Sequence, residues 1–288
     1  MMDFKNAREL LDLCSENHCP ISTIMREREC DQGETTSEEA DGRMRRVLER
    51  SSATEPIEKP GKSMGGLIGG EARKLAVRRE HGQAVCGTVM SRAITHAMAV
   101  LEVNSSMGLI VAAPTAGSSG IVPGLLLALQ EEYGLTDERL IDALYNAGAV
   151  GYLAMRNATV AGAVGGCQAE VGIASAMAAS AAVELMEGTP EQCLYAASTV
   201  LMNMLGLVCD PVGGLVEYPC QNRNASGVAN ALIAAEISLS GIRQLIPFDE
   251  MLATMYSVGK KLPSELRETA LGGCASTPSA CQLCHLSS

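Results

Sequence analysis

Apolar residues recur at intervals of three and four along most of the chain, which is the spacing of a helix with one buried face. Alternation of apolar and polar residues, typical of a half-buried strand, is scarce. The patterns predict helices over residues 71–82, 91–108, 136–159, 161–188, 189–208, 224–242 and 247–262. The alanine-rich stretch 161–188 is expected to be a central core helix, because Gln168 and Glu170 interrupt it before it reaches the roughly 20 apolar residues of a membrane span. The sequence therefore predicts a mostly α fold without a membrane segment.

Stretches that contain proline and glycine divide this pattern into three expected parts. Residues 1–60 are predicted to form an N-terminal helical arm, which ends in a Pro- and Gly-containing loop or linker over 51–71. Residues 61–273 are predicted to form a single helical catalytic domain whose Gly- and Pro-rich loops carry the site, and residues 274–288 a cysteine-rich tail. Between the two clearer helices of the arm, the acidic stretch 29–43 is expected to be a loop or a helix start.

Composition narrows the classes of protein that remain. The hydrophobic fraction is 47% while aromatic residues are 3% and tryptophan is absent, so small side chains must fill the core, which favours closely packed helices. A net charge of −11 argues against nucleic-acid binding, which needs a basic surface. The charged N-terminus lacks the apolar region of a signal peptide, so a cytoplasmic location is expected.

The chain has eleven cysteines, and this odd number fits poorly with a purely disulfide framework. Three lie in helical patterns and are most simply core or surface thiols: Cys14, Cys86 and Cys193. A zinc site at Cys19 and Cys30 lacks a supporting second CxxC pair. Three others, each beside glycine or proline, suit a bulky inorganic cluster that needs close approach of the backbone: Cys167, Cys209 and Cys220. Spacing alone leaves open whether these three are cluster ligands or unrelated buried thiols.

Five segments, in order, carry a resemblance to a known family. They are SMGGLIGGEARKL, APTAGSSGIVPG, GGCQAEVG, GLVCDPVGGLVEYPCQNRNASGVANA and ELRETALGG. Together they resemble the catalytic alpha chain of iron–sulfur L-serine dehydratase, from about residue 10 to residue 273. The resemblance implies a [4Fe-4S] cluster held by Cys167, Cys209 and Cys220, with one iron left open. It also implies a separate beta chain, a small α/β domain to which nothing in this chain is similar.

The activity implied by the resemblance is that of a lyase which degrades L-serine to pyruvate and ammonia. The pyruvate can feed gluconeogenesis. An open iron acts as a Lewis acid on the substrate hydroxyl while a base removes the α-proton. Glu170, three residues after Cys167, is a candidate base or else a buried hydrogen-bond acceptor. No pyridoxal phosphate is expected, since Lys74 has no phosphate-binding cup beside it; Lys74 is either a solvated helix lysine or a cation for the substrate carboxylate.

The loop PTAGSSG is the best anion-binding candidate, because its hydroxyls and amides can converge on a carboxylate. Its predicted substrate-binding residues are Thr115, Ser118, Ser119 and Gly120. The alternative is a helix–helix loop with Ser/Thr caps. Arg223 could pair with a substrate carboxylate or with a negative cluster, and Asn224 could bind substrate or simply cap the next helix.

The tail and the substrate leave alternatives open. CQLCH resembles half a zinc site or a haem attachment motif, whereas in related enzymes a C-terminal cysteine acts as a removable fourth ligand. The candidates for that role here are Cys281 and Cys284, and Cys274 departs from the family pattern; the plain alternative is an oxidation-prone terminus. Two other functions also remain: a cluster-dependent L-cysteine desulfidase, and an iron–sulfur sensor without turnover.

Overall fold

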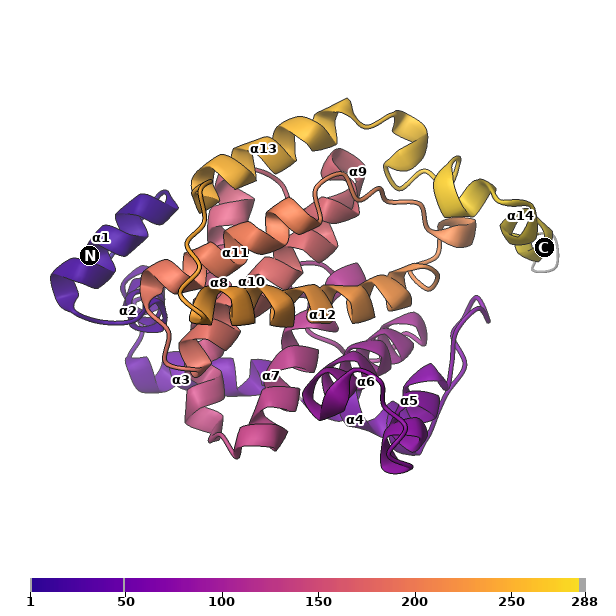
Figure 1. Cartoon of the computed structure of the whole chain (residues 1–288), viewed down its shortest axis with the longest axis horizontal. Helices are drawn as coiled ribbons and strands as arrows, with labels where there is room; N and C mark the ends of the chain where they lie inside the picture. Colours follow the sequence, from indigo (N-terminus) through magenta and orange to yellow (C-terminus); the bar gives the residue numbers. More distant parts are fainter. Residues whose placement is uncertain (1, 49, 285–288) are drawn as a thin grey trace.

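The computed structural model describes residues 2–48 and 50–284, and over these residues the chain is built of helices joined by loops, without a β-strand (Figure 1). The α-helices are α1 (Ala7–Asn17), α2 (Ile21–Gly33), α3 (Ser37–Val47), α4 (Ser51–Glu58), α5 (Glu71–Glu80), α6 (Gly87–Ser105), α7 (Ile121–Tyr133), α8 (Asp137–Asn157), α9 (Gly162–Gly165), α10 (Ile173–Leu185), α11 (Pro190–Asn203), α12 (Cys220–Leu239), α13 (Phe248–Lys261) and α14 (Pro278–Cys284). Short 3₁₀ turns, and one π-helical segment at Gln168–Gly172, lie between them. The prediction of a mostly α fold is confirmed.

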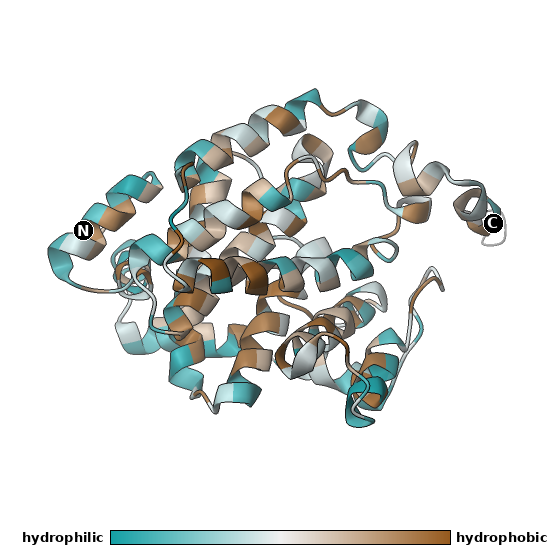
Figure 2. Ribbon diagram, in the orientation of Figure 1, coloured by the Kyte–Doolittle hydropathy of each residue, from teal (hydrophilic) through white to brown (hydrophobic). Residues whose placement is uncertain are grey.

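Helix α10 lies at the centre of the molecule. Every residue of α10 except Glu184 is buried, and the helix packs against α7, α8, α11 and α12. Its sequence, IASAMAASAAVEL, presents mainly alanine, so neighbouring helices approach it closely on every side. In Figure 2 hydrophobic residues are dense along the central helices, while hydrophilic residues are frequent on peripheral ones such as α5. Small apolar side chains thus fill a core in which aromatic residues are few.

The prediction of one continuous helix over 161–188 is wrong in its first part. That stretch contains a single turn, α9, then the π-helical segment, and only then the regular helix α10. Gly166 has a φ of +75°, which ends α9, and the N–H of Gln168 donates to the carbonyl of Leu207 on another segment instead of to its own helix. The break lies where the sequence has Gly-Gly-Cys, directly before the candidate site.

The N-terminal segment belongs to the same hydrophobic core as the rest of the chain. The core around α10 also contains four fully buried residues of this segment: Phe4, Leu10, Ile24 and Ala53. The expectation of a loop or linker over 51–71 is wrong for its first part, because α4 forms there even though it contains Pro56. Burial of Ala53 and Pro56 against α6 stabilises this short helix. The division into arm, catalytic domain and tail stays a prediction.

One helix boundary differs from the predicted one at a functionally relevant place. Helix α12 begins at Cys220, four residues before the predicted start, so Asn224 lies inside the helix and does not cap it. Helix α8 begins where the pattern placed it, and Thr136 caps it by accepting a hydrogen bond from the N–H of Arg139. Within residues 2–48 and 50–284, the helices all fall short of the length and apolar character that crossing a bilayer requires.

Candidate active site

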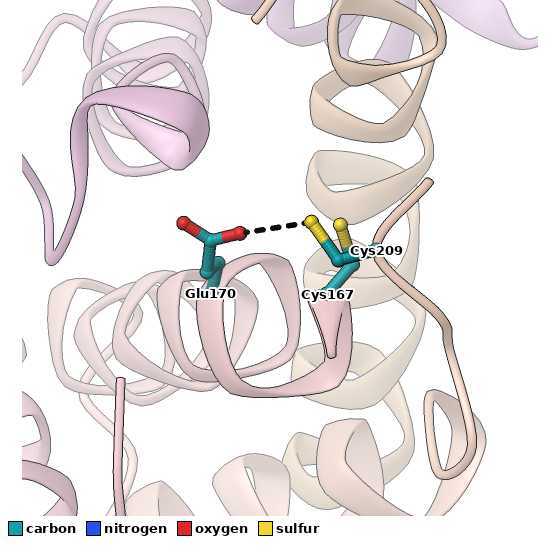
Figure 3. A group of neighbouring side chains, drawn as sticks. All are labelled: Cys167, Glu170 and Cys209. Carbon is teal, nitrogen blue, oxygen red and sulfur yellow. Dashed lines mark hydrogen bonds between the residues drawn. The ribbon is translucent and has the colours of Figure 1, made fainter. Parts of the chain in front are cut away.

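Three side chains that can bind metal meet at the start of the central segment. The sulfurs of Cys167 and Cys209 and a carboxylate oxygen of Glu170 all lie within 4.8 Å of one another (Figure 3). Cys167 directly precedes the π-helical segment and Glu170 lies in it, so both project from the same side of the chain, and Cys209 approaches from a separate loop. Cys167 and Cys209 are each 3% exposed. The sequence predicted these three residues, and the structure brings them together.

Backbone hydrogen bonds hold the Cys209 loop on both sides. The N–H of Gly206 donates to Oε1 of Gln168 at 2.8 Å, which fixes the loop against the π-helical segment. The N–H of Cys209 donates to the carbonyl of Leu266, and the carbonyl of Cys209 accepts from the N–H of Glu268. These two bonds form an isolated parallel bridge between Cys209 and the segment after α13. The position of the Cys209 thiol is therefore determined by parts of the chain far apart in sequence.

Glu170 is a half-buried carboxylate with two polar neighbours. Its Oε1 accepts a hydrogen bond from Oγ1 of Thr115 at 3.0 Å, and its Oε2 lies 3.7 Å from the sulfur of Cys209. Burial raises the pKa of Glu170 above the ordinary value, and the Thr115 hydroxyl opposes that rise. A methyl group on Gly162 would lie 2.4 Å from Oε2 of Glu170 and 3.0 Å from Sγ of Cys209, so glycine leaves the space that this carboxylate occupies.

Arg223 supplies positive charge beside the cysteines. Its Nη1 lies 3.6 Å from Sγ of Cys167, donates to the carbonyl of Val208 at 2.9 Å and pairs with the carboxylate of Asp210 at 2.6 Å. Burial lowers the pKa of Arg223, but the negative charges of Cys167 and Asp210 outweigh this and raise it. Of the two roles left open by the sequence, this contact with a cysteine sulfur favours pairing with a negative cluster. Pairing of Arg223 with a substrate carboxylate stays a prediction.

Cys220 is buried at the first position of α12 but is not part of the close group formed by Cys167, Glu170 and Cys209. Burial, together with the charge of Cys167, raises the pKa of the Cys220 thiol to about 12. For Cys209, a hydrogen bond with Cys167 and then burial raise the pKa. These thiols hold their protons strongly unless a cation compensates their charge.

The 115–120 loop uses most of its polar groups internally. Ser118 and Ser119 are fully buried, and their hydroxyls donate to carbonyls of the same loop. The N–H of Gly120 donates to Oδ1 of Asn224, whose Nδ2 donates in turn to the carbonyl of Gly117. Asn224 thereby fastens the loop to α12, and direct contact of these residues with a substrate stays a prediction.

Two N–H groups of that loop are not used in this internal network. Within the described ranges, the amides of Ala116 and Gly117 have no hydrogen-bond partner, and Gly117 lies close to Oε1 of Glu170. The hydroxyl of Thr115, which contacts Glu170, lies directly before them. The part of the loop that is available to a ligand is thus its first half, not the serines of its second half.

Lys74 and the tail lie apart from this group. The side chain of Lys74 is 76% exposed on α5 and pairs with Glu71 at 3.7 Å, so the structure places it as a solvated helix lysine; its catalytic role stays a prediction without geometric support. Cys281 is exposed, and the side chains of Cys284 and His285 lie outside the described residues. The N–H of Cys274 donates to Oδ2 of Asp210, which attaches the start of the tail near the site.

Sequence reasoning missed three residues that shape the site: Gly162, Asp210 and Glu217. Gly162 makes room for Glu170, and Asp210 joins Arg223 to the start of the tail. Glu217 is 3% exposed and accepts three hydrogen bonds from the 63–67 loop. A signal was present for Asp210 and Glu217, since each is an acidic residue within a Pro- and Gly-rich motif that also carries a cysteine.

Comparison with known proteins identifies the family. A family model described as serine dehydratase alpha chain matches residues 16–275. The probable L-serine dehydratase alpha chain of Bacillus subtilis is 46% identical over 97% of this chain and 94% of its own length. The L-serine dehydratase alpha chain of Peptoniphilus asaccharolyticus is 44% identical, covering 93% of each chain. An L-serine dehydratase of Helicobacter pylori is 34% identical over 96% of this chain but only 62% of its own length. The chain belongs to the serine dehydratase alpha-chain family.

Proposed function

We propose that this protein is the catalytic chain of an L-serine dehydratase, which converts L-serine to pyruvate and ammonia with the help of a [4Fe-4S] cluster. The observation that carries the proposal is the grouping of two buried cysteine thiols with a half-buried glutamate, which accepts a hydrogen bond from the Thr115 hydroxyl. Relatives of nearly the same length bear the name L-serine dehydratase, alpha chain. The family and the donor set point to the same chemistry.

The residues present fit an iron–sulfur cluster held by Cys167, Cys209 and Cys220. Thiolates are the ligands of such clusters, and the raised pKa values of the Cys209 and Cys220 thiols mean that metal charge must replace their protons on binding. Arg223 offers an N–H to the sulfur of Cys167, a contact of the kind that tunes cluster sulfur. When bound, the cluster supplies a Lewis-acidic iron that stabilises negative charge on the departing hydroxyl oxygen.

The protein's own groups bind and orient the amino acid. The free amides of Ala116 and Gly117, with the Thr115 hydroxyl, offer donors to a substrate carboxylate. Glu170 takes the α-proton, and its raised pKa suits it to accept a proton from carbon and release it later. The hydrogen bond from the Thr115 hydroxyl keeps the half-buried carboxylate of Glu170 aimed in one direction.

We also propose that a second chain completes the enzyme. The chain spans almost the whole length of its alpha-chain relatives but only 62% of the Helicobacter pylori L-serine dehydratase. A separate beta chain would correspond to the remaining part of that longer protein.

Anaerobic purification together with a beta chain tests the proposal. We expect bound iron and sulfide, and formation of pyruvate from L-serine faster than sulfide release from L-cysteine. Changing Cys167, Cys209 or Cys220 singly to serine is expected to remove the visible absorbance, while Cys86→Ser, at an exposed cysteine, leaves it intact. An active protein without iron would remove the cluster from the proposal, and an iron-containing protein that is inert towards both amino acids would support a sensor instead.

A further inference from the structure

A buried carboxylate outside the cysteine group connects two distant glycine-rich segments. Glu217 lies three residues before Cys220 and is 3% exposed. Its Oε2 accepts from the hydroxyl of Ser63 at 2.6 Å and from the N–H of Leu67 at 3.0 Å, and its Oε1 accepts from the N–H of Gly65 at 2.7 Å. Hydrogen bonds to a charged, buried acceptor are the strong ones, so this contact fixes both segments.

The other faces of the same turn touch the candidate substrate loop. Residues 215–217 alternate: Leu215 and Glu217 meet the 63–67 loop, while Val216 meets the 115–120 loop. A methyl group on Gly65 would lie 2.3 Å from Cδ1 of Leu215 and 2.8 Å from Oε1 of Glu217, so a larger residue would displace both side chains. A methyl group on Gly117 would lie 3.4 Å from Cγ1 of Val216 and 3.7 Å from Oε1 of Glu170. The turn is therefore packed between the two loops.

The backbone after Glu217 leads directly into the helix of Cys220. The carbonyl of Glu217 accepts from the N–H of Gln221 at 2.9 Å, within the first turn of α12. The side chain of Gln221 donates to Oε1 of Glu102 at 3.2 Å, and the same oxygen accepts from the N–H of Ala72 at 2.9 Å. A second buried carboxylate thus ties α5, which follows the 63–67 loop, to the first turn of the Cys220 helix.

These contacts also show what the glycine-rich 63–70 loop does not do. Its amides at Gly65 and Leu67 are taken by Glu217, and its amide at Gly69 donates to Glu71 at 2.6 Å. Free amides of this kind bind phosphate in other proteins, but here the chain's own carboxylates occupy them. The loop serves as an internal anchor.

We infer that Glu217 is a positioning residue: by anchoring the 63–67 loop to the 213–219 turn, it holds Cys220 and Val216 in place against the substrate loop. The inference rests on the proposed function for the role of Cys220 as a ligand. The anchor itself does not need a bound cluster, because all of its contacts lie within this chain. Its loss releases two segments at once, although they are separated by about 150 positions in sequence.

Hydrogen exchange on the metal-free chain and kinetics on the complete enzyme test this role together. In Glu217→Gln the side-chain N–H₂ group lies opposite hydrogen-bond donors of the 63–67 loop. Two donors then face each other where the carboxylate oxygen had been an acceptor. We expect exchange to become about tenfold faster or more, both in peptides covering 63–68 and in peptides covering 213–222. The matched control is Glu71→Gln, which exchanges the charged acceptor of Gly69 on the same loop for a neutral amide, at a side chain that contacts Gly69 and Lys74. It is expected to speed exchange near Gly69 alone.

The complete enzyme gives the second readout. With Glu217→Gln we expect about half the iron per chain, or less, and a raised KM for L-serine, whereas Glu71→Gln keeps the iron content and KM of the original protein. If Glu217→Gln does not fold, Ser63→Ala removes one donor and should give the same two-segment pattern of exchange with a smaller change.

The possible results separate the inference from the proposed function. Fast exchange confined to the 63–68 peptides, or iron and KM unchanged in Glu217→Gln, would overturn the positioning role. Absence of iron from the original protein would overturn the proposed cluster, and the exchange pattern would still decide whether Glu217 anchors the turn.

Discussion

Helix α10 and the eleven residues before it form one continuous stretch of chain with two opposite characters. From Ile173 to Leu185 the backbone is regular and buried on nearly all sides by other helices. From Gly162 to Gly172 it passes through a single α-turn, a glycine with positive φ and a π-helical segment, and this part carries Cys167 and Glu170. Close packing against other helices requires the regular backbone of α10. The candidate site requires an irregular backbone, because it directs the side chains of Cys167 and Glu170 towards Cys209.

The difference shows how one element can provide both rigidity and chemistry. The alanine face of α10 fixes the segment in the middle of the core, so the irregular part before it starts from an immobile support. Wide helical turns such as this π-helical segment are frequent at functional sites. Substitutions in the first part should alter catalysis with little effect on folding, and substitutions in the second part should do the reverse.

The largest effect is expected at Glu170. In Glu170→Gln the side chain keeps its shape and an acceptor oxygen for the Thr115 hydroxyl but can no longer take a proton. We expect kcat for L-serine to fall by about 10²- to 10⁴-fold, with the visible absorbance retained. Steady-state kinetics of the anaerobic enzyme measure this. A variant with more than a tenth of the original kcat would show that Glu170 is not the base.

Gly162→Ala sharpens the comparison with a single methyl group. The group would lie 2.4 Å from Oε2 of Glu170 and 3.0 Å from Sγ of Cys209, so the carboxylate must shift. We expect kcat/KM to fall by about 10²-fold, because small displacements of a catalytic group are costly, while the melting temperature changes little. The comparison fails if thermal melting drops sharply and the activity per folded molecule is normal.

Ala178→Leu provides the opposite case within α10. Ala178 is fully buried, and its helix has neighbours on every side, so extra methylene groups force the packing apart. We expect the free energy of unfolding to decrease by about 1–3 kcal/mol, measured by urea denaturation of the metal-free chain. KM for L-serine should stay near its original value. A changed KM would mean that the core helix and the site are not mechanically separate.

The smallest effect is expected outside both regions, at Glu131. A hydrogen bond from His96, with help from the charge of Arg92, lowers the pKa of Glu131 below 4.5. A lowered carboxylate pKa contributes stability above the unfolded-state pKa, and this contribution is lost as the pH falls through the folded-state value. Because Glu131 is 44% exposed, Glu131→Gln should lower the free energy of unfolding at pH 7 by less than about 1 kcal/mol. The difference between the two proteins should shrink below pH 4.5, and a difference that grows there would contradict the assignment.

Helix periodicity predicted the fold class and most helices because the apolar positions follow the period of 3.6 closely. It failed at residues 162–172, since alanine and glycine are apolar in any conformation and do not reveal where the helix turns irregular. It also failed at Ser51–Glu58, where proline suggested a loop but burial against α6 forms a helix. In both places tertiary contacts decide the local structure.

For the candidate site, the sequence predicted the chemically distinctive residues better than their contacts. Cys167, Glu170 and Cys209 were singled out and do meet. The serines of the 115–120 loop were expected to face a ligand, yet their hydroxyls bond within the loop. Which groups of a loop are free depends on its folded hydrogen bonds, so the roles of Asn224 and Glu217 become visible only in the structure.

The π-helical segment at Gln168–Gly172 has a consequence for how length changes in this chain are tolerated. A wide turn accommodates one more residue than an α-turn, and each residue of an α-helix advances the azimuth by about 100°. Deleting a single amino acid here would restore an ordinary helical repeat and leave α10 seated as before. It would also change the direction of the Glu170 side chain relative to Cys167 and Cys209, because the residues inside the wide turn are redistributed while the chain on either side keeps its place.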